Sequence, residues 1–561
     1  MYLIKKTVVL CHLYNAAFAA SDNIVRLEPS VNPPPDISSP VDPSFAGFGI
    51  EASNLFSFTG GAEPNNFTLN LLNNLANYTG KPPNIRIGGN TQDYMLFQET
   101  HDDWTWIDNR DAVGQGNFKS DSMLIGNRFF ETANRLPKGT TVTWGLNLAY
   151  QQDDYIEKIT TMARQVLTKC PNLNITSFEI GNEPDLYSRN GFRAGEWGGK
   201  VYTQQWLDRA SAISTQVLQP HGIAGNFFEA AATASTIGTD FQIANLEGFD
   251  ISTTKAAGSA FPYLSGWNQH DYYYYIGVSE FTVTLEYLLR LRETEDQLTA
   301  WREQIAQARK TPYPYALREM GVVGPIGLAG VTDVFGAALW TLNFLLYAAS
   351  LGVAAVGLHM TDNSNASAWQ PVDMYGQPPH VRPIYYGVAA FDEAIGSSNT
   401  AQVARHEIAG CPEGYEDFVR AYDVYRSGRL AAVVVVNGMV ANSSLPVKGN
   451  VTVELQLPVS AAGQVVYLAY LTSAGADATA NTTWNGVSFE QSGDGTPAQV
   501  SNDNRTVQVA ADGTANFTLR DSEAVVASLG EKVGNSTAVV TSFRSAKVRK
   551  ELGSPGWSIF P

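Results

Sequence analysis

Short apolar runs alternate with longer helical patterns through the first two thirds of the chain. Eight runs have the length and composition of buried strands, at 45–51, 84–88, 141–148, 177–181, 228–234, 265–270, 315–319 and 353–359. Between them, apolar residues recur at the spacing of one helix face, as in 202–217 and 298–308. Eight alternating units predict an α/β fold, a closed (β/α)8 TIM barrel. An open doubly wound sheet is the alternative, but no G-x-G-x-x-G turn follows the first run.

The sequence changes character from residue 397 onward. Runs rich in Val, Thr and Ser alternate polar and apolar residues with period two, and Gly, Asn and Asp separate them. This pattern is typical of an antiparallel β-sandwich. We therefore expect a catalytic barrel at 44–396, a C-terminal β-sandwich domain at 397–545 and a tail at 546–561. Residues 20–43 are expected to hold a short strand and a proline-rich linker.

The N-terminus has the features of a secretory signal peptide. Lys5 and Lys6 precede an apolar stretch that ends in the small-residue sequence Ala17-Phe18-Ala19, which predicts cleavage after residue 19. A buried first strand is the alternative. Ten Asn-x-Ser/Thr sequons also favour a secreted, extracellular glycoprotein. They lie at Asn66, Asn77, Asn174, Asn365, Asn442, Asn450, Asn481, Asn504, Asn516 and Asn535.

Composition excludes several classes of partner. A formal net charge of −17 disfavours nucleic acid. The apolar segment 337–359 contains Gly352 and divides into a helix-length part and a strand, so we expect no membrane span. Three Cys and seven His are too few and too scattered for a zinc site, and we expect neither a metal nor an organic cofactor. Cys170 and Cys411 either pair or are both free, and the sequence leaves the oligomeric state open.

The motif Ser177-Phe-Glu-Ile-Gly-Asn-Glu-Pro-Asp185 places Glu183 at the end of the fourth predicted strand. Catalytic groups of a barrel lie at the carboxyl ends of its strands. A second carboxyl, Glu319, ends the seventh predicted strand, which lies across the barrel mouth from the fourth. Two such groups suit glycoside hydrolysis, with Glu183 as acid/base and Glu319 as nucleophile. The alternatives are a simple strand-ending turn at Glu183 and a buried ion pair between Arg318 and Glu319.

The chain resembles glycoside hydrolase family 79 of clan A, the β-glucuronidase and heparanase-like enzymes. The resemblance covers nearly the whole mature chain. It rests on FEIGNEPD, on 84–93 with its sequence NIRIGGNTQD, on His270 and Tyr272, on 332–340 and on Pro383-Ile-Tyr-Tyr386. It implies that the N-terminal strand packs on the sandwich.

The resemblance also implies roles for further residues. Asn182 would contact the bound sugar, and Tyr272 would lie near the nucleophile. The other residues expected to bind substrate are Glu51, Thr91, Gln92, Asp93, His270 and Tyr385. Each has a structural alternative, such as helix capping for Asp93 or packing for Tyr385.

One stretch departs from the family pattern. Members that recognise glucuronate carry a tyrosine and successive glycines after the nucleophile. Here Gly324 stands at the tyrosine position and Pro325 has no N–H to donate. The expected activity is that of a secreted retaining β-glycoside hydrolase, a β-glucuronidase acting on glucuronic-acid-bearing glycans by double displacement. The alternatives are a β-glycosidase for a neutral sugar, an endo-acting heparanase-like enzyme and a non-catalytic carbohydrate-binding wall protein.

Overall fold

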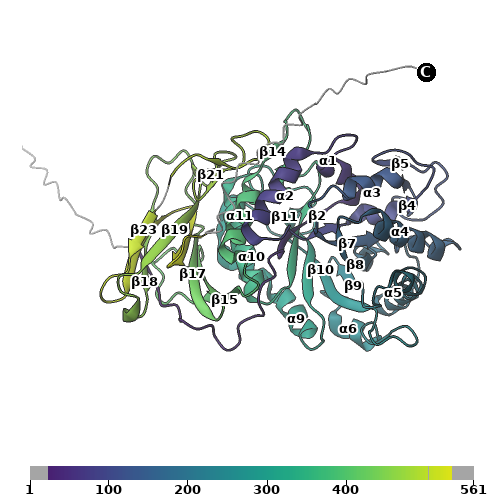
Figure 1. Cartoon of the computed structure of the whole chain (residues 1–561), viewed down its shortest axis with the longest axis horizontal. Helices are drawn as coiled ribbons and strands as arrows, with labels where there is room; N and C mark the ends of the chain where they lie inside the picture. Colours follow the sequence, from purple (N-terminus) through teal and green to yellow (C-terminus); the bar gives the residue numbers. More distant parts are fainter. Residues whose placement is uncertain (1–22, 503–504, 534–561) are drawn as a thin grey trace, which may run out of the picture.

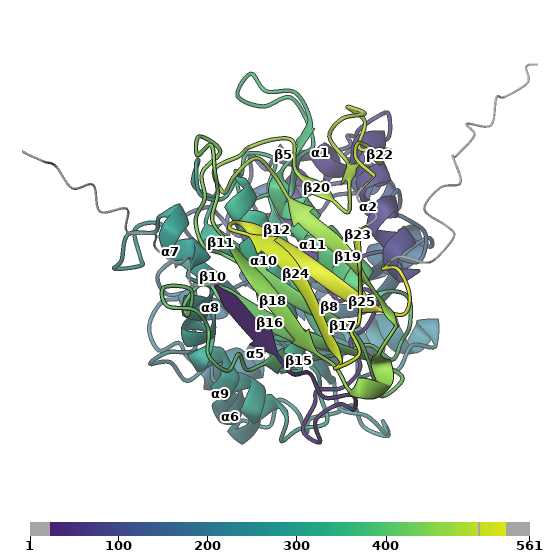
Figure 2. The ribbon, with the colours of Figure 1, turned by 90° about the vertical axis from the view of Figure 1, so that its left-hand side faces the viewer.

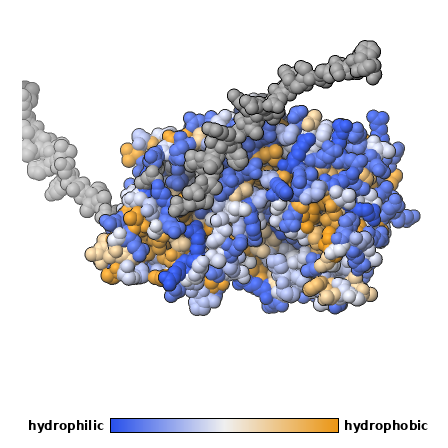
Figure 3. Space-filling model, in the orientation of Figure 1, coloured by the Kyte–Doolittle hydropathy of each residue, from blue (hydrophilic) through white to orange (hydrophobic). Residues whose placement is uncertain are grey.

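A computed structural model of the chain describes residues 23–502 and 505–533. The predicted signal peptide at 1–19 and the predicted tail at 546–561 lie outside the described residues. The described part forms a barrel, on the right of Figure 1, and a β domain on the left. The face seen in Figure 3 is mostly hydrophilic, with smaller apolar patches over both parts.

Eight parallel strands form the closed barrel. In order around it they are β2 (Ala46–Ile50), β3 (Ile85–Ile87), β7 (Thr141–Leu146), β8 (Asn174–Ile180), β9 (Phe228–Thr233), β10 (Leu264–Tyr275), β11 (Tyr315–Gly324) and β12 (Ala355–Met360). Pairing of β12 with β2 closes the ring. Each strand coincides with one of the eight predicted runs, which confirms the predicted barrel. Strands β10 and β11 extend five residues beyond His270 and Glu319, respectively, and these extensions pair with each other.

Helices surround the barrel. They include α2 (Asn66–Thr79), α3 (Asn127–Ala133), α4 (Tyr155–Lys169), α5 (Gly199–Ile213), α6 (Ile243–Gly248), α9 (Thr299–Ala308), α10 (Phe335–Ser350) and α11 (Pro383–Ile395). Helices α10 and α11 lie between the barrel and the β domain (Figure 1) and are buried along almost their whole length. Burial on both sides explains why α10 is apolar all round. Within the described ranges, no helix has the length and apolarity needed to cross a membrane.

The C-terminal domain is an antiparallel sandwich, as predicted. Its larger sheet contains β15 (Gln402–His406), β16 (Val419–Arg426), β17 (Arg429–Asn437), β25 (Glu523–Leu529) and β19 (Val465–Thr472), with shorter strands beyond β19. Its smaller sheet has the order β1 (Ile24–Leu27), β18 (Asn450–Gln456), β24 (Thr514–Arg520). Figure 2 shows the purple β1 beside β18, with which it pairs in parallel. Val25 and Leu27 of β1 are fully buried in the core between the two sheets.

Two further features bear on the barrel. A three-stranded sheet of β4 (Met95–Phe97), β6 (Met123–Ile125) and β5 (Trp106–Asp108) is inserted after β3. Cys170 and Cys411 are both free, so of the two alternatives for these cysteines the structure has the unpaired one. Cys170 is buried beside the Phe130 carbonyl of α3.

Candidate active site

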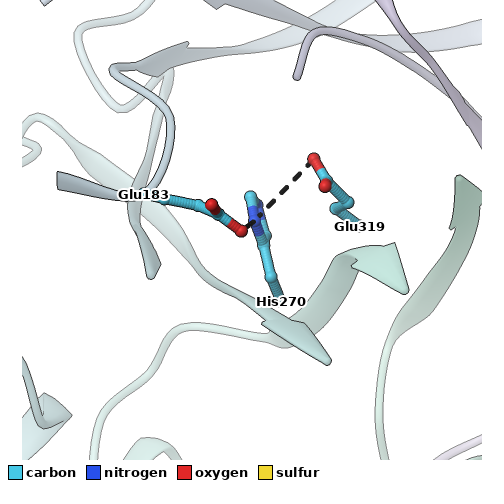
Figure 4. Close-up of side chains that lie close together, drawn as sticks. All are labelled: Glu183, His270 and Glu319. Carbon is cyan, nitrogen blue, oxygen red and sulfur yellow. Dashed lines mark hydrogen bonds and ion pairs between the residues drawn. The ribbon is translucent and has the colours of Figure 1, made fainter. Parts of the chain in front are cut away.

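Glu183 and Glu319 meet at the carboxyl ends of the barrel strands. Glu183 lies three residues past the end of β8, and Glu319 lies within β11. One carboxylate oxygen of each and a ring nitrogen of His270 lie within 4.8 Å of one another. Figure 4 shows the His270 ring between the two carboxyl groups. The Glu183 and Glu319 side chains are only 14% and 8% exposed, so both are largely removed from solvent.

The turn that carries Glu183 has a constrained backbone. Glu183 has a φ of 48°, in the left-handed region, and its N–H donates to the Ala232 carbonyl at 2.8 Å. Gly181, two residues before Glu183, has a φ of 87°. A Cβ on Gly181 would lie 2.8 Å from side-chain atoms of Leu148 and Tyr187. A non-glycine residue would be strained there on both counts. Glycine at 181 therefore permits the turn that directs Glu183 into the barrel mouth.

Asp93 supports the same turn from below. Its buried carboxylate accepts the Asn182 N–H at 2.9 Å and the Tyr187 hydroxyl at 2.6 Å. It also accepts the N–H groups of Leu148 and Ala149 beyond β7. Asp93 is only 1% exposed and thus joins the loops after β3, β7 and β8. Its contacts in the structure are with protein groups beneath the site.

Arg86 of β3 connects the floor of the site to Glu319. Its guanidinium is fully buried and donates to Glu179 and to Glu319, both at 2.5 Å, and to Asn182 at 2.7 Å. Burial lowers the pKa of Arg86, but the charges of Glu179 and Glu319 reverse this effect and raise it above its ordinary value. Arg86 therefore remains charged and holds one oxygen of Glu319 in place.

Two residues of β10 contact the carboxyl groups directly. His270 pairs with Glu319 in the strand register, and its Nδ1 lies 3.1 Å from Glu183 Oε1 and 3.8 Å from Glu319 Oε2. The Tyr272 hydroxyl donates to Glu319 Oε1 at 2.9 Å. Burial and the charge of Glu319 keep the pKa of Tyr272 well above its ordinary value, so the phenol retains its proton. Tyr272 and Arg86 thus hold the two oxygens of Glu319 separately.

The surroundings give the two carboxyl groups opposite charge states. Burial, reinforced by the negative charge of Glu319, raises the pKa of Glu183 to about 8. Burial also acts to raise the pKa of Glu319, but the positive groups around it lower that pKa far below its ordinary value. Because burial lowers the pKa of His270 to about 4, its ring is neutral at neutral pH. Arg86, which stays charged, and His359, whose pKa is raised, then favour the ionised form of Glu319.

Glu51, Thr91 and His359 form a group beside Glu319. The Glu51 carboxylate accepts the Thr91 N–H at 2.9 Å and the Thr91 hydroxyl at 2.5 Å. His359 Nε2 lies 3.6 Å from Glu51, and its Nδ1 lies 3.8 Å from Glu319. Burial lowers the pKa of His359, but Glu319 and Glu51 raise it above its ordinary value. Gln92 is buried beside this group and accepts the Gly89 N–H at 3.1 Å.

The structure contradicts the expected role of Tyr385. Its side chain is fully buried in α11, and its hydroxyl donates to the Leu71 carbonyl of α2 at 2.8 Å. Its ring packs against Trp369 and Phe489, with centroids 6.2 Å and 5.0 Å away. The residue belongs to the core between barrel and sandwich, because α11 is buried along its whole length. Of the remaining expected residues, Asn182, His270, Tyr272, Glu51 and Thr91 lie around the two carboxyl groups, with Gln92 and Asp93 behind them.

Three residues of the site, Arg86, Glu179 and His359, were not among the predicted site residues. Each had a recognisable signal, since Arg86 and Glu179 are charged residues inside apolar strand patterns, and His359 ends the eighth predicted strand. Glu179 is held by Arg86 and by the Asn268 side-chain amide. A charged group inside a buried strand must find a partner, so such residues indicate an internal network.

The three groups Glu183, His270 and Glu319 could approach a metal ion together. However, Arg86 already places a guanidinium on the Glu319 oxygen nearest His270. A cation there would face the charge of Arg86 at short range. The donor set therefore suits proton transfer and nucleophilic attack better than metal binding.

The chain is similar in sequence to known proteins over most of its length. Residues 421–526 match the glycosyl hydrolase family 79 C-terminal beta domain. A β-glucuronidase of Aspergillus niger is 28% identical over 527 residues, which cover 89% of this chain and 93% of that protein. A β-glucuronidase of Neurospora crassa is 26% identical over 507 residues, which cover 84% and 89%, respectively.

Solved structures share the fold. A 4-O-α-L-rhamnosyl-β-D-glucuronidase from Fusarium oxysporum 12S superposes with a TM-score of 0.73 at 20% identity, covering 90% of this chain and 100% of that one. An α-L-arabinofuranosidase from Thermotoga maritima superposes with a TM-score of 0.56 at 12% identity, covering 90% and 98%. The matches therefore span both the barrel and the sandwich.

Proposed function

Because this chain belongs to glycoside hydrolase family 79, we propose that it hydrolyses β-glucuronides by double displacement, with Glu319 as nucleophile and Glu183 as acid/base. The observation that carries the assignment is the position of the two carboxyl groups, whose oxygens lie within 4.8 Å of each other in surroundings that raise the pKa of Glu183 and lower that of Glu319. Carboxyl groups about 5 Å apart suit retaining hydrolysis, whereas inverting enzymes need wider spacing to admit a water. Substrate identity is inferred from the two related β-glucuronidases.

In the first step, an ionised Glu319 oxygen attacks the anomeric carbon of the bound sugar. The bond from that carbon to the leaving oxygen breaks, and the proton of Glu183 passes to the leaving oxygen. Tyr272 and Arg86 hold Glu319 so that one oxygen faces the sugar. The products are a glycosyl ester on Glu319 and a free aglycone.

In the second step, Glu183 is ionised and takes a proton from a water molecule. The water oxygen bonds to the anomeric carbon as the bond to Glu319 breaks, which restores both carboxyl groups. His270 lies 3.1 Å from Glu183, and its burial keeps it neutral. It therefore orients Glu183 without adding a charge that would draw the proton away too early.

A neutral sugar is a second candidate substrate, because of the loop that follows β11. Gly324 carries no side chain, and Pro325 cannot donate a hydrogen bond. A purely carbohydrate-binding role fits less well, since a binding site alone needs neither the raised pKa of Glu183 nor the lowered pKa of Glu319. Endo-acting hydrolysis would use the same two carboxyl groups.

The substrate can be tested with 4-nitrophenyl glycosides. We expect the β-glucuronide to be cleaved with a higher kcat/KM than the β-glucoside, β-galactoside and β-xyloside. Glu319→Gln, prepared in the same way, should lose turnover on every substrate and so rules out a contaminating hydrolase. Preferential cleavage of a neutral sugar would refute the glucuronidase assignment while leaving the catalytic pair in place.

The pH profile follows from the two charge states. Catalysis needs Glu319 ionised and Glu183 protonated. We therefore expect kcat/KM to stay constant through mildly acidic and neutral pH. It should fall as the pH rises through the pKa of Glu183, which is about 8. On the acid side, kcat/KM should fall only below the pH at which a glutamate ordinarily titrates, because the pKa of Glu319 is lowered. Glu183→Gln has no proton to lose there, and on an activated aryl glycoside it should lose the alkaline limb. If kcat/KM of this variant still fell at alkaline pH, the fall would report the titration of a group other than Glu183.

We also propose that the protein is secreted and N-glycosylated. Among the sequon asparagines that the structure describes, Asn66, Asn174, Asn442, Asn450, Asn481 and Asn516 are exposed. Exposure of the acceptor is what glycosylation requires. Protein recovered from the culture medium of a eukaryotic host should lose mass on treatment with an N-glycan-cleaving amidase. Retention inside the cell, or an unchanged mass, would refute this proposal.

A further inference from the structure

Two tyrosines of the extended strand β10 line one side of the site. The Tyr272 and Tyr275 rings meet edge to face, with centroids 5.5 Å apart and planes at 88°. Tyr272 is hydrogen-bonded to Glu319, so Tyr275 stands next to the residue that holds the nucleophile. Both rings are partly exposed.

The place of Tyr275 depends on Gly324. The two residues are paired across β10 and β11, and the Ile276 N–H donates to the Gly324 carbonyl at 3.0 Å. A Cβ on residue 324 would lie 2.6 Å from the Tyr275 ring and 2.7 Å from the Tyr272 ring. The space that a side chain at 324 would occupy is therefore filled by two tyrosines from the neighbouring strand.

The Tyr275 hydroxyl has no hydrogen-bond partner among the residues that the structure describes. Charged groups of the site act on its pKa. Burial raises the pKa of Tyr275, the charges of Glu183 and Glu319 raise it further, and the charge of Arg189 acts in the opposite direction. The phenol therefore experiences the charges of both carboxyl groups and of the Arg189 guanidinium.

Arg189 lies in the loop that follows β8, six residues after Glu183, and is exposed. Across 23–502 and 505–533, no carboxylate forms an ion pair with it. The other cationic groups of the site are already engaged, since Arg86 is bonded to Glu179 and Glu319, and His359 lies against Glu51. Arg189 is therefore a guanidinium available to an anionic ligand, and its charge acts on Tyr275.

The loop after β11 offers little to an anion. Pro325 has no N–H, the Gly327 N–H is donated to the Val323 carbonyl, and the Leu328 N–H is donated to the Thr332 hydroxyl, both at 3.0 Å. A carboxylate on the bound sugar would also be repelled by the ionised Glu319. Binding of this carboxylate therefore needs a cationic side chain and a hydrogen-bond donor from elsewhere in the site.

We propose that Tyr275 and Arg189 bind the carboxylate of the sugar held between Glu183 and Glu319, and so determine preference for a uronic acid over a neutral sugar. The proposal rests on the proposed β-glucuronidase function. The planar guanidinium matches a carboxylate with two parallel N–H groups, and the phenol donates a third hydrogen bond. Both groups act on substrate binding and leave the proton transfers to Glu183.

The test compares Tyr275→Phe and Arg189→Gln with the unchanged enzyme on 4-nitrophenyl β-glucuronide and β-glucoside. Each substitution should lower kcat/KM on the glucuronide about tenfold or more, the loss expected for a charge-assisted hydrogen bond, mainly through KM. Activity on the glucoside should change less than about twofold. Arg429→Gln, at the exposed start of β17 in the sandwich, is the matched control and should change neither.

Product inhibition gives a second readout that does not depend on turnover of a poor substrate. Glucuronate should inhibit the unchanged enzyme more strongly than glucose, and both variants should lose this difference. Raising the salt concentration should weaken inhibition by glucuronate in the unchanged enzyme but not in Arg189→Gln, because salt screens the exposed charge.

The outcomes separate this proposal from the function on which it rests. Suppose that the unchanged enzyme prefers the glucuronide. If both variants then lose the same activity on the two substrates, or lose no activity on either, the carboxylate binds elsewhere and only the present proposal fails. If the unchanged enzyme prefers the glucoside, the glucuronidase function and this proposal both fail.

Discussion

The buried guanidinium of Arg86 is the interaction on which the site depends. It joins β3 to β8 through Glu179 and Asn182, and to β11 through Glu319. Removing such a group from water is costly, and its two carboxylate partners must offset that cost. The charge of Arg86 also contributes to lowering the pKa of Glu319, so it favours the ionised form of that carboxyl group. The negative charge of Glu319 adds to the effect of burial and raises the pKa of Glu183. Arg86, together with His359, therefore influences the protonation of both carboxyl groups.

The barrel converts this local arrangement into a substrate site. Parallel strands place the ends of β8, β10 and β11 at one rim, where Glu183, His270 and Glu319 meet. The backbone of the Glu183 turn is fixed by Gly181 and by the hydrogen bonds of Asp93. Strands β10 and β11 run past the catalytic groups and form a wall on which Tyr275 stands. In the proposed mechanism the carboxyl groups at the barrel rim carry the chemistry, and the strand extensions and the loop of Arg189 carry recognition.

Much of the barrel was predictable from the sequence, because most of its strands are buried and rich in apolar residues. Glu183 and Glu319 were predictable because each ends such a run. Long-range contacts were not, since nothing in the sequence says that Arg86 reaches Glu179 and Glu319 rather than Glu51. Tyr385 was misassigned for a related reason, because a tyrosine near the start of the last helix fits either a sugar site or a core. Only the packing of α11 against the sandwich decides between them. The lengths of β10 and β11 were also underestimated, since the run of tyrosines 272–275 does not alternate between polar and apolar residues.

Covalent labelling of Glu319 would test the mechanism most directly. A 2-deoxy-2-fluoro-β-glucuronide with a good leaving group should form the ester normally but hydrolyse slowly, because fluorine destabilises the oxocarbenium-like transition states and the leaving group compensates only in the first step. Intact-mass and peptide mass spectrometry should then find one glycosyl group per chain, on the peptide that contains Glu319, and none on Glu319→Gln. Labelling of a different carboxyl group, or release of the α-anomer from a normal substrate without any covalent adduct, would contradict the assignment of Glu319 as nucleophile.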